Sequence, residues 1–208
     1  MHNEGDVARL RRRWERYAPR YDRDMGFIER LQFGGGREWV CSQASGDVLE
    51  VAIGTGRNLP FYPDGVRLTG IDFSPAMLGI ARKRAAELGR EVVLREGDAQ
   101  ALTFPDASFD TVVCTLSLCG VPDHRAAIAE MHRVLRPGGK LLLLDHIGSH
   151  HRLIRLGQQL LEKLTLRMIG DHQTRRPLPL VEQAGFVIQR QERLKAGTVE
   201  RLTAIKGD

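Results

Sequence analysis

Short apolar runs alternate with amphipathic stretches between residues 47 and 145. Apolar runs bounded by glycine, proline and polar residues are typical of buried strands, whereas the longer stretches repeat at helical spacing. The pattern predicts strands over residues 47–53, 66–71, 92–95, 109–114 and 140–145, with helices that begin at residue 75 and span residues 123–135. This alternation predicts an α/β fold in which helices cover a parallel sheet.

Helical patterns also flank this core. Residues 9–42 predict a helical cap, interrupted at Pro19 and again at the three glycines of residues 34–36. After the core, the pattern predicts helices over residues 152–169 and 179–184, then strands over 186–191 and 198–206 that pair as a hairpin. Because no repeat or linker interrupts the chain, we expect one domain over residues 1–208, built from a cap (1–42), a core (47–145), and a substrate-side insert with the terminal hairpin (146–208).

The turn after the first strand is the first candidate for chemistry. Gly54 and Gly56 remove two side chains there, so that the backbone can approach a ligand closely at the carboxyl edge of the sheet. A dinucleotide fingerprint would need a third glycine where Leu59 stands. Asp72, at the end of the second strand, can accept hydrogen bonds from ribose hydroxyls, whether the ribose belongs to a dinucleotide or to another nucleoside cofactor.

Further motifs follow in order along the chain: Gly97-Asp98-Ala99, the segment from Phe104 to Asp110, and the segment from Arg133 to Gly139. Together with the Gly54 turn and the segment from Gly70 to Leu78, they resemble the class I S-adenosylmethionine-dependent methyltransferases over about half of the chain. The resemblance implies a Rossmann-like open twisted sheet of seven mostly parallel strands, with helices on both faces and the last strand antiparallel. It also implies S-adenosylmethionine as the cofactor, with S-adenosylhomocysteine as its product.

The resemblance also implies which residues bind the cofactor. Gly54 and Gly56 would lie against its methionine part, with Glu50 ordering the turn, and Asp72 would bind the ribose. Phe73 and Met77 would flank the adenine, while Asp98 and the Ala99 N–H would bind its edge. The full expected set is Glu50, Ala52, Gly54, Gly56, Asn58, Asp72, Phe73, Met77, Asp98, Ala99, Thr115 and Leu116.

Two of these residues have a structural alternative. Glu50, in a buried strand, is also explained as a paired structural carboxylate. Asp98, after a glycine, is also explained as a turn residue that bonds to its own backbone.

Candidates for the methyl-transfer step are few, because an activated donor mainly needs an aligned acceptor in a desolvated site. His146 follows the fifth strand and His172 lies in the loop before residue 179, so both are candidate bases. Tyr21 is expected to close the cofactor pocket, and the alternative is that Trp14, Tyr17 and Tyr21 form an apolar helix face that packs on the sheet. His146, His150 and His151 lack a carboxylate or cysteine partner at a metal-ligand spacing, so no metal site is expected.

Composition and charge limit which binding partners and which cellular location are expected. The chain has 42% hydrophobic and 27% charged residues and a net charge of +5, as in an ordinary globular protein. Its cationic residues are spread along the chain without a known nucleic-acid motif, so no nucleic-acid partner is expected. Three cysteines, an odd number, argue against a disulfide framework and for a cytoplasmic location.

The methyl acceptor stays open at this point. The segment from Tyr17 to Asp22 resembles quinone C-methyltransferases, whereas the region from His146 to Phe186 resembles phospholipid and thiol methyltransferases, from which it departs at Asp171. We expect a small, lipophilic or aromatic acceptor: a quinol, phenol, thiol or amine. The alternative is a non-catalytic sensor or scaffold that only binds the cofactor.

The amphipathic insert over residues 152–169 affects which oligomeric state we expect. We expect a lid packed on the sheet or a dimer contact, so the protein would be a monomer or a homodimer. Peripheral contact with an anionic membrane is the alternative for this insert.

Overall fold

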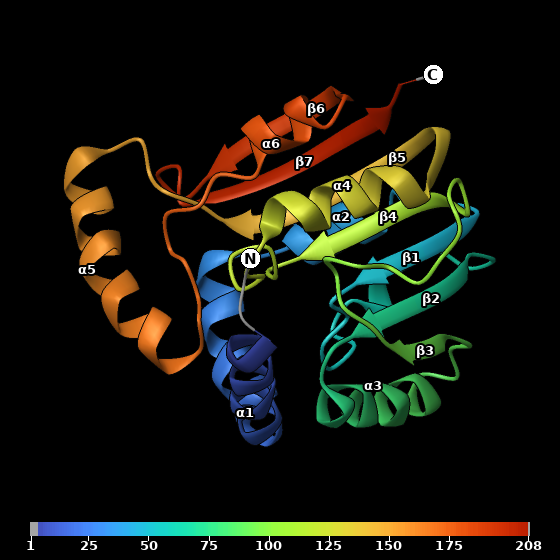
Figure 1. Cartoon of the computed structure of the whole chain (residues 1–208), viewed down its shortest axis with the longest axis horizontal. Coiled ribbons are helices and arrows are strands. Elements are labelled where there is room, and N and C mark those ends of the chain that lie inside the picture. The colour runs from blue at the N-terminus through green and yellow to red at the C-terminus, as the bar shows by residue number, and fades with distance from the viewer. Residues whose placement is uncertain (1–3, 208) are drawn as a thin grey trace.

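The computed structural model describes residues 4–207, so residues 1–3 and 208 of the expected domain lie outside it. A single seven-stranded sheet in the order β3-β2-β1-β4-β5-β7-β6 forms its centre (Figure 1). All neighbouring strands are parallel except β7, which runs antiparallel to both β5 and β6. The strands are β1 (Asp47–Val51), β2 (Arg67–Asp72), β3 (Val93–Glu96), β4 (Phe109–Thr115), β5 (Leu135–His146), β6 (Phe186–Leu194) and β7 (Val199–Lys206). The expected fold class and terminal hairpin are confirmed.

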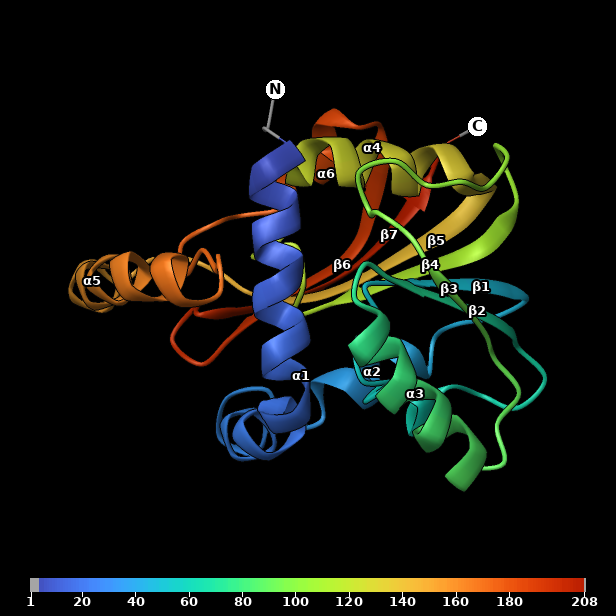
Figure 2. The same cartoon turned by 60° about the horizontal axis from the view of Figure 1, so that its bottom comes forward.

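Helices cover both faces of this sheet (Figure 2). α2 (Gly36–Cys41) and α3 (Pro75–Glu87) lie on one face, and α4 (His124–Val134) and α6 (Leu178–Gln183) lie on the other. A separate buried apolar cluster fills the space on each side. Because both faces are covered, the central strands can be apolar on both sides, which explains their continuous apolar runs.

The N-terminal cap is the long helix α1 (Glu4–Gln32), which crosses the carboxyl edge of the parallel strands (Figure 2). The predicted break at Pro19 is wrong, because α1 continues through it. Ala18 is buried, and Asp22, one turn later, is held by side chains of the core, so tertiary contacts maintain the helix across the missing hydrogen bond. The chain turns instead at Gly35, whose φ of 72° is in the left-handed region that glycine adopts readily.

The start of the fifth strand also differs from the prediction. β5 begins at Leu135 and not at residue 140, so Pro137 lies inside the strand. The register between β4 and β5 shifts just there, between Phe109 and Thr111, and such an irregularity tolerates a proline that donates no ladder hydrogen bond. Between β1 and β2, the 3-10 helix η1 (Leu59–Phe61) follows the Gly56 turn.

The helix α5 (Arg152–Met168) projects from the body of the molecule, as both views show (Figures 1 and 2). It contains no buried residue. Its polar side chains face the body, since Gln158, Glu162 and Thr165 all bond to the chain on either side of the helix. The apolar side chains exposed on it are Leu153, Ile154, Leu156, Leu160, Leu161, Leu164 and Met168. The interpretation of a lid that packs its apolar face on the sheet is therefore wrong. No helix of the described residues is both long and apolar enough to cross a membrane.

Candidate active site

A cavity of about 780 Å³ opens at the carboxyl edge of the parallel strands. Its wall is built by α1, by the loops that follow β1, β2, β3, β4 and β5, and by the inner side of α5. In an open α/β sheet this edge is where ligands bind, because the loops there diverge and leave a crevice.

The turn after β1 forms one side of this cavity. Gly54 and Gly56 have φ values of 57° and 76°, and Ala52 adopts 56° although it carries a side chain. A Cβ atom added at Gly54 would meet nothing within 4 Å, whereas one at Gly56 would come within 2.8 Å of the Leu59 side chain. Gly54 therefore leaves open space beside a possible ligand, and Gly56 allows the turn to pack closely.

Asp72 is held at the end of β2 by two backbone donors. The Gly54 N–H donates to its Oδ2 and the Ser74 N–H to its Oδ1, both at 2.9 Å. The residue is only 5% exposed. Burial raises the pKa of Asp72 to about 6, although the backbone hydrogen bonds oppose the rise. At neutral pH the carboxyl group is thus ionised, with lone pairs left to accept hydrogen bonds from a ligand.

Glu50 lies beneath the turn, outside the cavity wall. Tyr62 Oη donates to its Oε2 and Asn58 Nδ2 to its Oε1, both at 2.8 Å. Burial raises the pKa of Glu50 to about 7, against the hydrogen bond from Tyr62 and the charge of Arg37. Both oxygens have protein partners, which is the structural arrangement that the sequence left open as an alternative.

Three aromatic rings of α1 face the cavity. Trp14, Tyr17 and Tyr21 all line it, and their ring centroids lie 5.9 to 6.0 Å from one another. Burial raises the pKa of Tyr21 to about 12. The Tyr21 hydroxyl therefore stays protonated at neutral pH and can serve as a hydrogen-bond donor.

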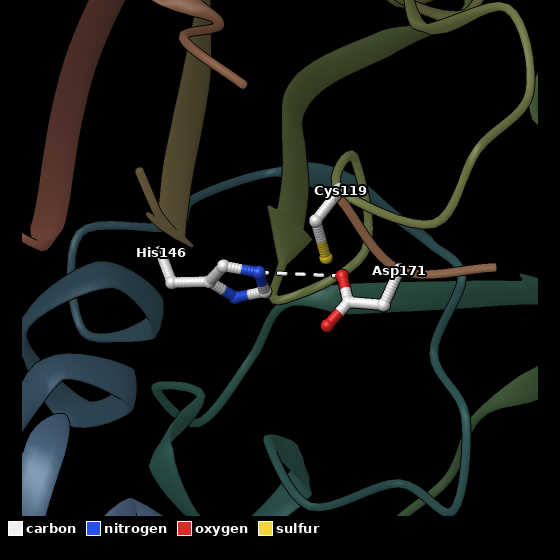
Figure 3. A group of neighbouring side chains, drawn as sticks. All are labelled: Cys119, His146 and Asp171. Atoms are coloured by element: carbon white, nitrogen blue, oxygen red, sulfur yellow. Dashed lines mark ion pairs between the residues drawn. The ribbon is translucent and has the colours of Figure 1, made fainter. Parts of the chain in front are cut away.

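Three side chains converge in another part of the wall (Figure 3). Cys119 comes from the loop after β4, His146 ends β5, and Asp171 follows α5. His146 Nε2 lies 3.2 Å from Asp171 Oδ1, and its Nδ1 lies 3.5 Å from Asp145 Oδ1. Burial alone would lower the pKa of His146, but its interaction with Asp171 and the charge of Asp145 raise it to about 9. His146 must therefore lose a firmly held proton before it can act as a base.

Most of the residues expected from the sequence line the cavity, and some do not. Those in the wall are Tyr21, Ala52, Gly54, Asp72, Phe73, Met77, Asp98, Ala99, Leu116 and His146. Those outside it are Glu50, Gly56, Asn58, Thr115 and His172.

The residues outside the wall have structural partners. Asn58 bonds to Thr115 Oγ1 as well as to Glu50, and both side chains are buried behind the turn. His172 faces Glu162 of α5 at 3.5 Å. Asp98, although it lines the cavity, accepts hydrogen bonds from the backbone and side chain of Gln100, which is the turn that the sequence left open as an alternative.

Sequence reasoning missed Cys119 and Asp171. Neither stands at a recognisable ligand spacing from His146, and only the departure from the phospholipid and thiol relatives at Asp171 drew attention to that residue. The loops that hold them are fastened together, because the His172 N–H donates to the Cys119 carbonyl at 3.1 Å.

The cavity fits the cofactor that the sequence implies. Asp72 offers a buried carboxylate for a pair of hydroxyls, Gly54 leaves space for a chain beside it, and Phe73 and Met77 offer apolar surface for a planar base. These three features line one continuous cavity, as a nucleoside joined to an amino-acid chain requires.

Comparisons with known proteins agree with this geometry. A family model described as "Methyltransferase domain" matches residues 49–143. Over 105 residues the chain is 48% identical to a phosphatidylethanolamine N-methyltransferase of Cereibacter sphaeroides, covering 50% of this chain and 52% of that protein. It is 38% identical over 139 residues to a demethylmenaquinone methyltransferase of Thermus thermophilus, covering 62% of this chain and 61% of that one.

A third relative has a different acceptor in its name. The chain is 38% identical over 135 residues to a human thiol S-methyltransferase, covering 62% of this chain and 54% of that protein. The matches thus span between 52% and 61% of these relatives' own lengths. Among solved structures, the YcgJ protein of Bacillus subtilis superposes with a TM-score of 0.69 at 20% identity, covering 85% of this chain and 98% of that one.

Proposed function

The chain belongs to the class I S-adenosylmethionine-dependent methyltransferases, and we propose that it methylates a small, lipophilic or aromatic acceptor inside the cavity between α1 and α5. The relatives act, by their names, on phosphatidylethanolamine, demethylmenaquinone and thiols. These names do not share one acceptor, so the apolar character of the acceptor proposed for this chain rests on the cavity wall.

The observation that carries the proposal is the Asp72 carboxylate. It is buried, ionised at neutral pH and held by the N–H groups of Gly54 and Ser74, so its remaining lone pairs are fixed in direction. A carboxylate held in this way accepts hydrogen bonds from two adjacent ribose hydroxyls. Phe73 and Met77, next along the wall, would then lie against the adenine.

When bound, the cofactor supplies a methyl group that its sulfonium centre has already activated. The residues of the chain therefore need to align the acceptor and exclude water. Trp14, Tyr17 and Tyr21 cover the cavity with aromatic surface, and the protonated Tyr21 hydroxyl offers a donor for a polar group of the acceptor. These roles support a methyl-transfer site that needs no catalytic triad.

The composition of the wall supports a lipophilic acceptor. Large apolar side chains of α1, of α5 and of the segments beside them contribute to it: Leu10, Trp14, Tyr17, Met25, Phe33, Leu161 and Ile169. Apolar surface of this extent favours binding of a ring or an alkyl chain over a fully polar molecule.

The outward face of α5 supports a lipid surface as the source of that acceptor. Leu153, Leu156 and Leu160 are 84%, 56% and 68% exposed, on the side of the helix away from the body. Arg152, Lys163 and Arg167 lie along one edge of this apolar face at helical spacing. An apolar face flanked by cations is complementary to an anionic membrane surface. Since Leu161 and Ile169 also line the cavity, a lipophilic molecule could enter directly from the lipid.

A calorimetric titration with S-adenosylhomocysteine tests the cofactor site, and transfer of a labelled methyl group to a panel of quinols, phenols, thiols and lipid amines tests the reaction. The expected result is saturable binding, lost or strongly weakened in Asp72→Ala, together with transfer to at least one acceptor. Binding that survives Asp72→Ala unchanged contradicts the assigned cofactor site. Tight binding without transfer to any acceptor favours the sensor or scaffold alternative.

A further inference from the structure

Cys119, His146 and Asp171 form a cluster of three different metal-ligand types in the cavity wall (Figure 3). One donor atom from each, the thiol sulfur, an imidazole nitrogen and a carboxylate oxygen, lie within 4.8 Å of one another. All three side chains point toward a common centre in Figure 3. The mechanism proposed above uses none of them.

Two of these atoms are buried and face each other. His146 Nε2 and Asp171 Oδ1 lie 3.2 Å apart as an ion pair, but among the described residues neither atom makes a hydrogen bond of regular geometry. Buried polar atoms nearly always have a well-directed partner. An ion between them would satisfy both atoms at once.

We propose that Cys119 Sγ, His146 Nε2 and Asp171 Oδ1 bind one zinc ion whose fourth coordination position opens into the cavity and takes a thiol acceptor as its thiolate. The acceptor half of this inference rests on the proposed methyltransferase function; the metal half does not. Zinc is the common metal for a mixed sulfur, nitrogen and oxygen set of three protein ligands with an open fourth position. A tetrahedral zinc ion holds nitrogen and oxygen ligands about 3.3 Å apart, close to the separation of His146 Nε2 and Asp171 Oδ1.

The charge of the cluster suits a divalent cation. A thiolate at Cys119 and the carboxylate of Asp171 together neutralise the ion, while His146 binds as a neutral ligand. Without an ion, the protonated imidazole of His146 lies against the buried carboxylates of Asp145 and Asp171. A bound divalent cation would replace this positive charge, and the protons of His146 and of the Cys119 thiol would leave to water.

Groups around the cluster hold the three ligands in place. Asp145 faces His146 Nδ1 at 3.5 Å and accepts from the Cys119 N–H at 3.3 Å, so one carboxylate orients two ligands. Gln173 Nε2 donates to Asp171 Oδ2 at 2.6 Å, which occupies that oxygen and leaves Oδ1 for the ion. A carboxylate behind a histidine ligand is the usual way in which proteins fix a zinc-bound imidazole.

Arg175 completes this support. Its guanidinium donates to the carbonyls of Leu118, Cys119 and Val121, and so fixes the loop that carries the cysteine. Side chains held by so many bonds from outside the cluster form a site before any ligand arrives.

The open position determines the class of acceptor. When a thiol binds there, its S–H bond breaks, its proton leaves to water, and its sulfur forms a bond to the zinc ion. Zinc lowers the pKa of a bound thiol because the cation stabilises the thiolate, and a thiolate is the reactive form of sulfur. The bound sulfur would face the same cavity that Asp72 and Gly54 line, where the methyl donor is expected.

Metal binding can be tested on the purified chain after dialysis against a chelator. Calorimetric titration with zinc chloride is expected to show one tightly bound equivalent, and titration with cobalt chloride to show the visible absorption of a tetrahedral thiolate-bound ion. Cys119→Ser and Asp171→Asn are expected to weaken zinc binding at least tenfold, and Asp145→Asn by about 10- to 100-fold. Cys41→Ser, another buried cysteine, and His151→Ala, an exposed histidine, serve as matched controls that should bind zinc as the original chain does.

The absence of zinc binding, or binding that Cys119→Ser and Asp171→Asn leave unchanged, overturns the metal site. Circular dichroism of each variant separates loss of ligand from loss of fold, and Asp171→Asn keeps the shape of the side chain. For the acceptor, benzyl mercaptan is expected to shift the cobalt spectrum, while benzylamine and phenol leave it unchanged. A spectrum that benzyl mercaptan does not shift overturns the thiol assignment. S-adenosylhomocysteine binding, measured without metal, reports separately on the proposed function.

Discussion

Asp22 of α1 forms an ion pair with Arg84 of α3, in which Arg84 Nη2 lies 2.6 Å from Asp22 Oδ2. The other oxygen of Asp22 accepts from Thr55 Oγ1, also at 2.6 Å, and Thr55 stands between the two glycines of the turn after β1. One carboxylate thus ties the cap helix to the turn and to the helix behind it. This contact is one of several that hold the cap over the cavity, since Glu29 of α1 also pairs with Arg37 and Arg57.

Replacing Asp22 by alanine is expected to weaken S-adenosylhomocysteine binding several-fold and to lower the free energy of unfolding by about 1–2 kcal/mol, because hydrogen bonds to a charged group are lost. Asp64→Ala removes a fully exposed carboxylate and is the control. Calorimetry and urea unfolding measure the two effects. An Asp22→Ala variant that behaves like Asp64→Ala would show that the cap is held by other contacts.

Asp72→Asn is expected to weaken S-adenosylhomocysteine binding about 10- to 100-fold, since hydrogen bonds to an ionised acceptor are stronger than those to an amide. Burial raises the pKa of Asp72 to about 6, so ionisation is lost as the pH falls through this value. The affinity of the original chain should therefore decline below about pH 6, whereas that of Asp72→Asn should not change there. Asp106→Asn, on an exposed carboxylate, is the matched control. A parallel pH dependence in both chains would contradict the role of Asp72.

Glu50→Gln is expected to flatten the dependence of stability on pH. Burial raises the pKa of Glu50 from its ordinary value of 4.5 to about 7, so the folded state retains a proton that the unfolded chain has lost. The contribution of Glu50 is thus full below pH 4.5 and falls by an amount on the order of 3 kcal/mol as the pH rises to about 7. Urea unfolding at pH 5 and pH 7.5 should show this decline in the original chain and a smaller one in Glu50→Gln. An equal decline in both would assign the effect to other groups.

The two glycines of the turn are expected to respond differently to alanine. At Gly56 a methyl group would lie 2.8 Å from Leu59 Cδ1 and 3.3 Å from Ala81 Cα, so Gly56→Ala should lower the free energy of unfolding by about 2–4 kcal/mol. At Gly54 nothing lies within 4 Å, so Gly54→Ala costs only the strain of a positive φ, about 1–2 kcal/mol. Its methyl group should instead reduce affinity for S-adenosylhomocysteine. Thermal unfolding and calorimetry separate the effects, and equal losses of stability would contradict this division.

The outward face of α5 is expected to bind anionic vesicles. A chain carrying both Leu156→Gln and Leu160→Gln should sediment with vesicles of phosphatidylglycerol and phosphatidylcholine much less than the original chain does, because both leucines are more than half exposed. Leu88→Gln, at the exposed leucine that directly follows α3, is the control. Vesicle binding that the double substitution leaves intact contradicts the assignment. A concentration-dependent dimer in sedimentation velocity, abolished by the same substitutions, would identify a second copy as the occupant.

The succession of strands and helices along the chain followed from the pattern of apolar runs, because this alternation is a local property that the sheet and its covering helices both require. The same pattern placed the Gly54 turn and Asp72 at the carboxyl ends of two parallel strands, and such ends meet at one edge of a sheet. The local pattern wrongly predicted a helix break at Pro19, because contacts from residues far along the chain hold the helix together there. It also could not show that Tyr62 and Asn58 would occupy both oxygens of Glu50.

The meeting of Cys119, His146 and Asp171 is a product of the folded chain. They come from the loop after β4, the end of β5 and the segment after α5, and no spacing rule predicts that their donor atoms meet. The direction of α5 was equally undetermined, because an amphipathic helix has the same pattern whether its apolar face lies on a sheet or points outward. The bonds of Gln158 and Glu162 to the body fixed that direction, and such contacts exist only once the whole chain has folded.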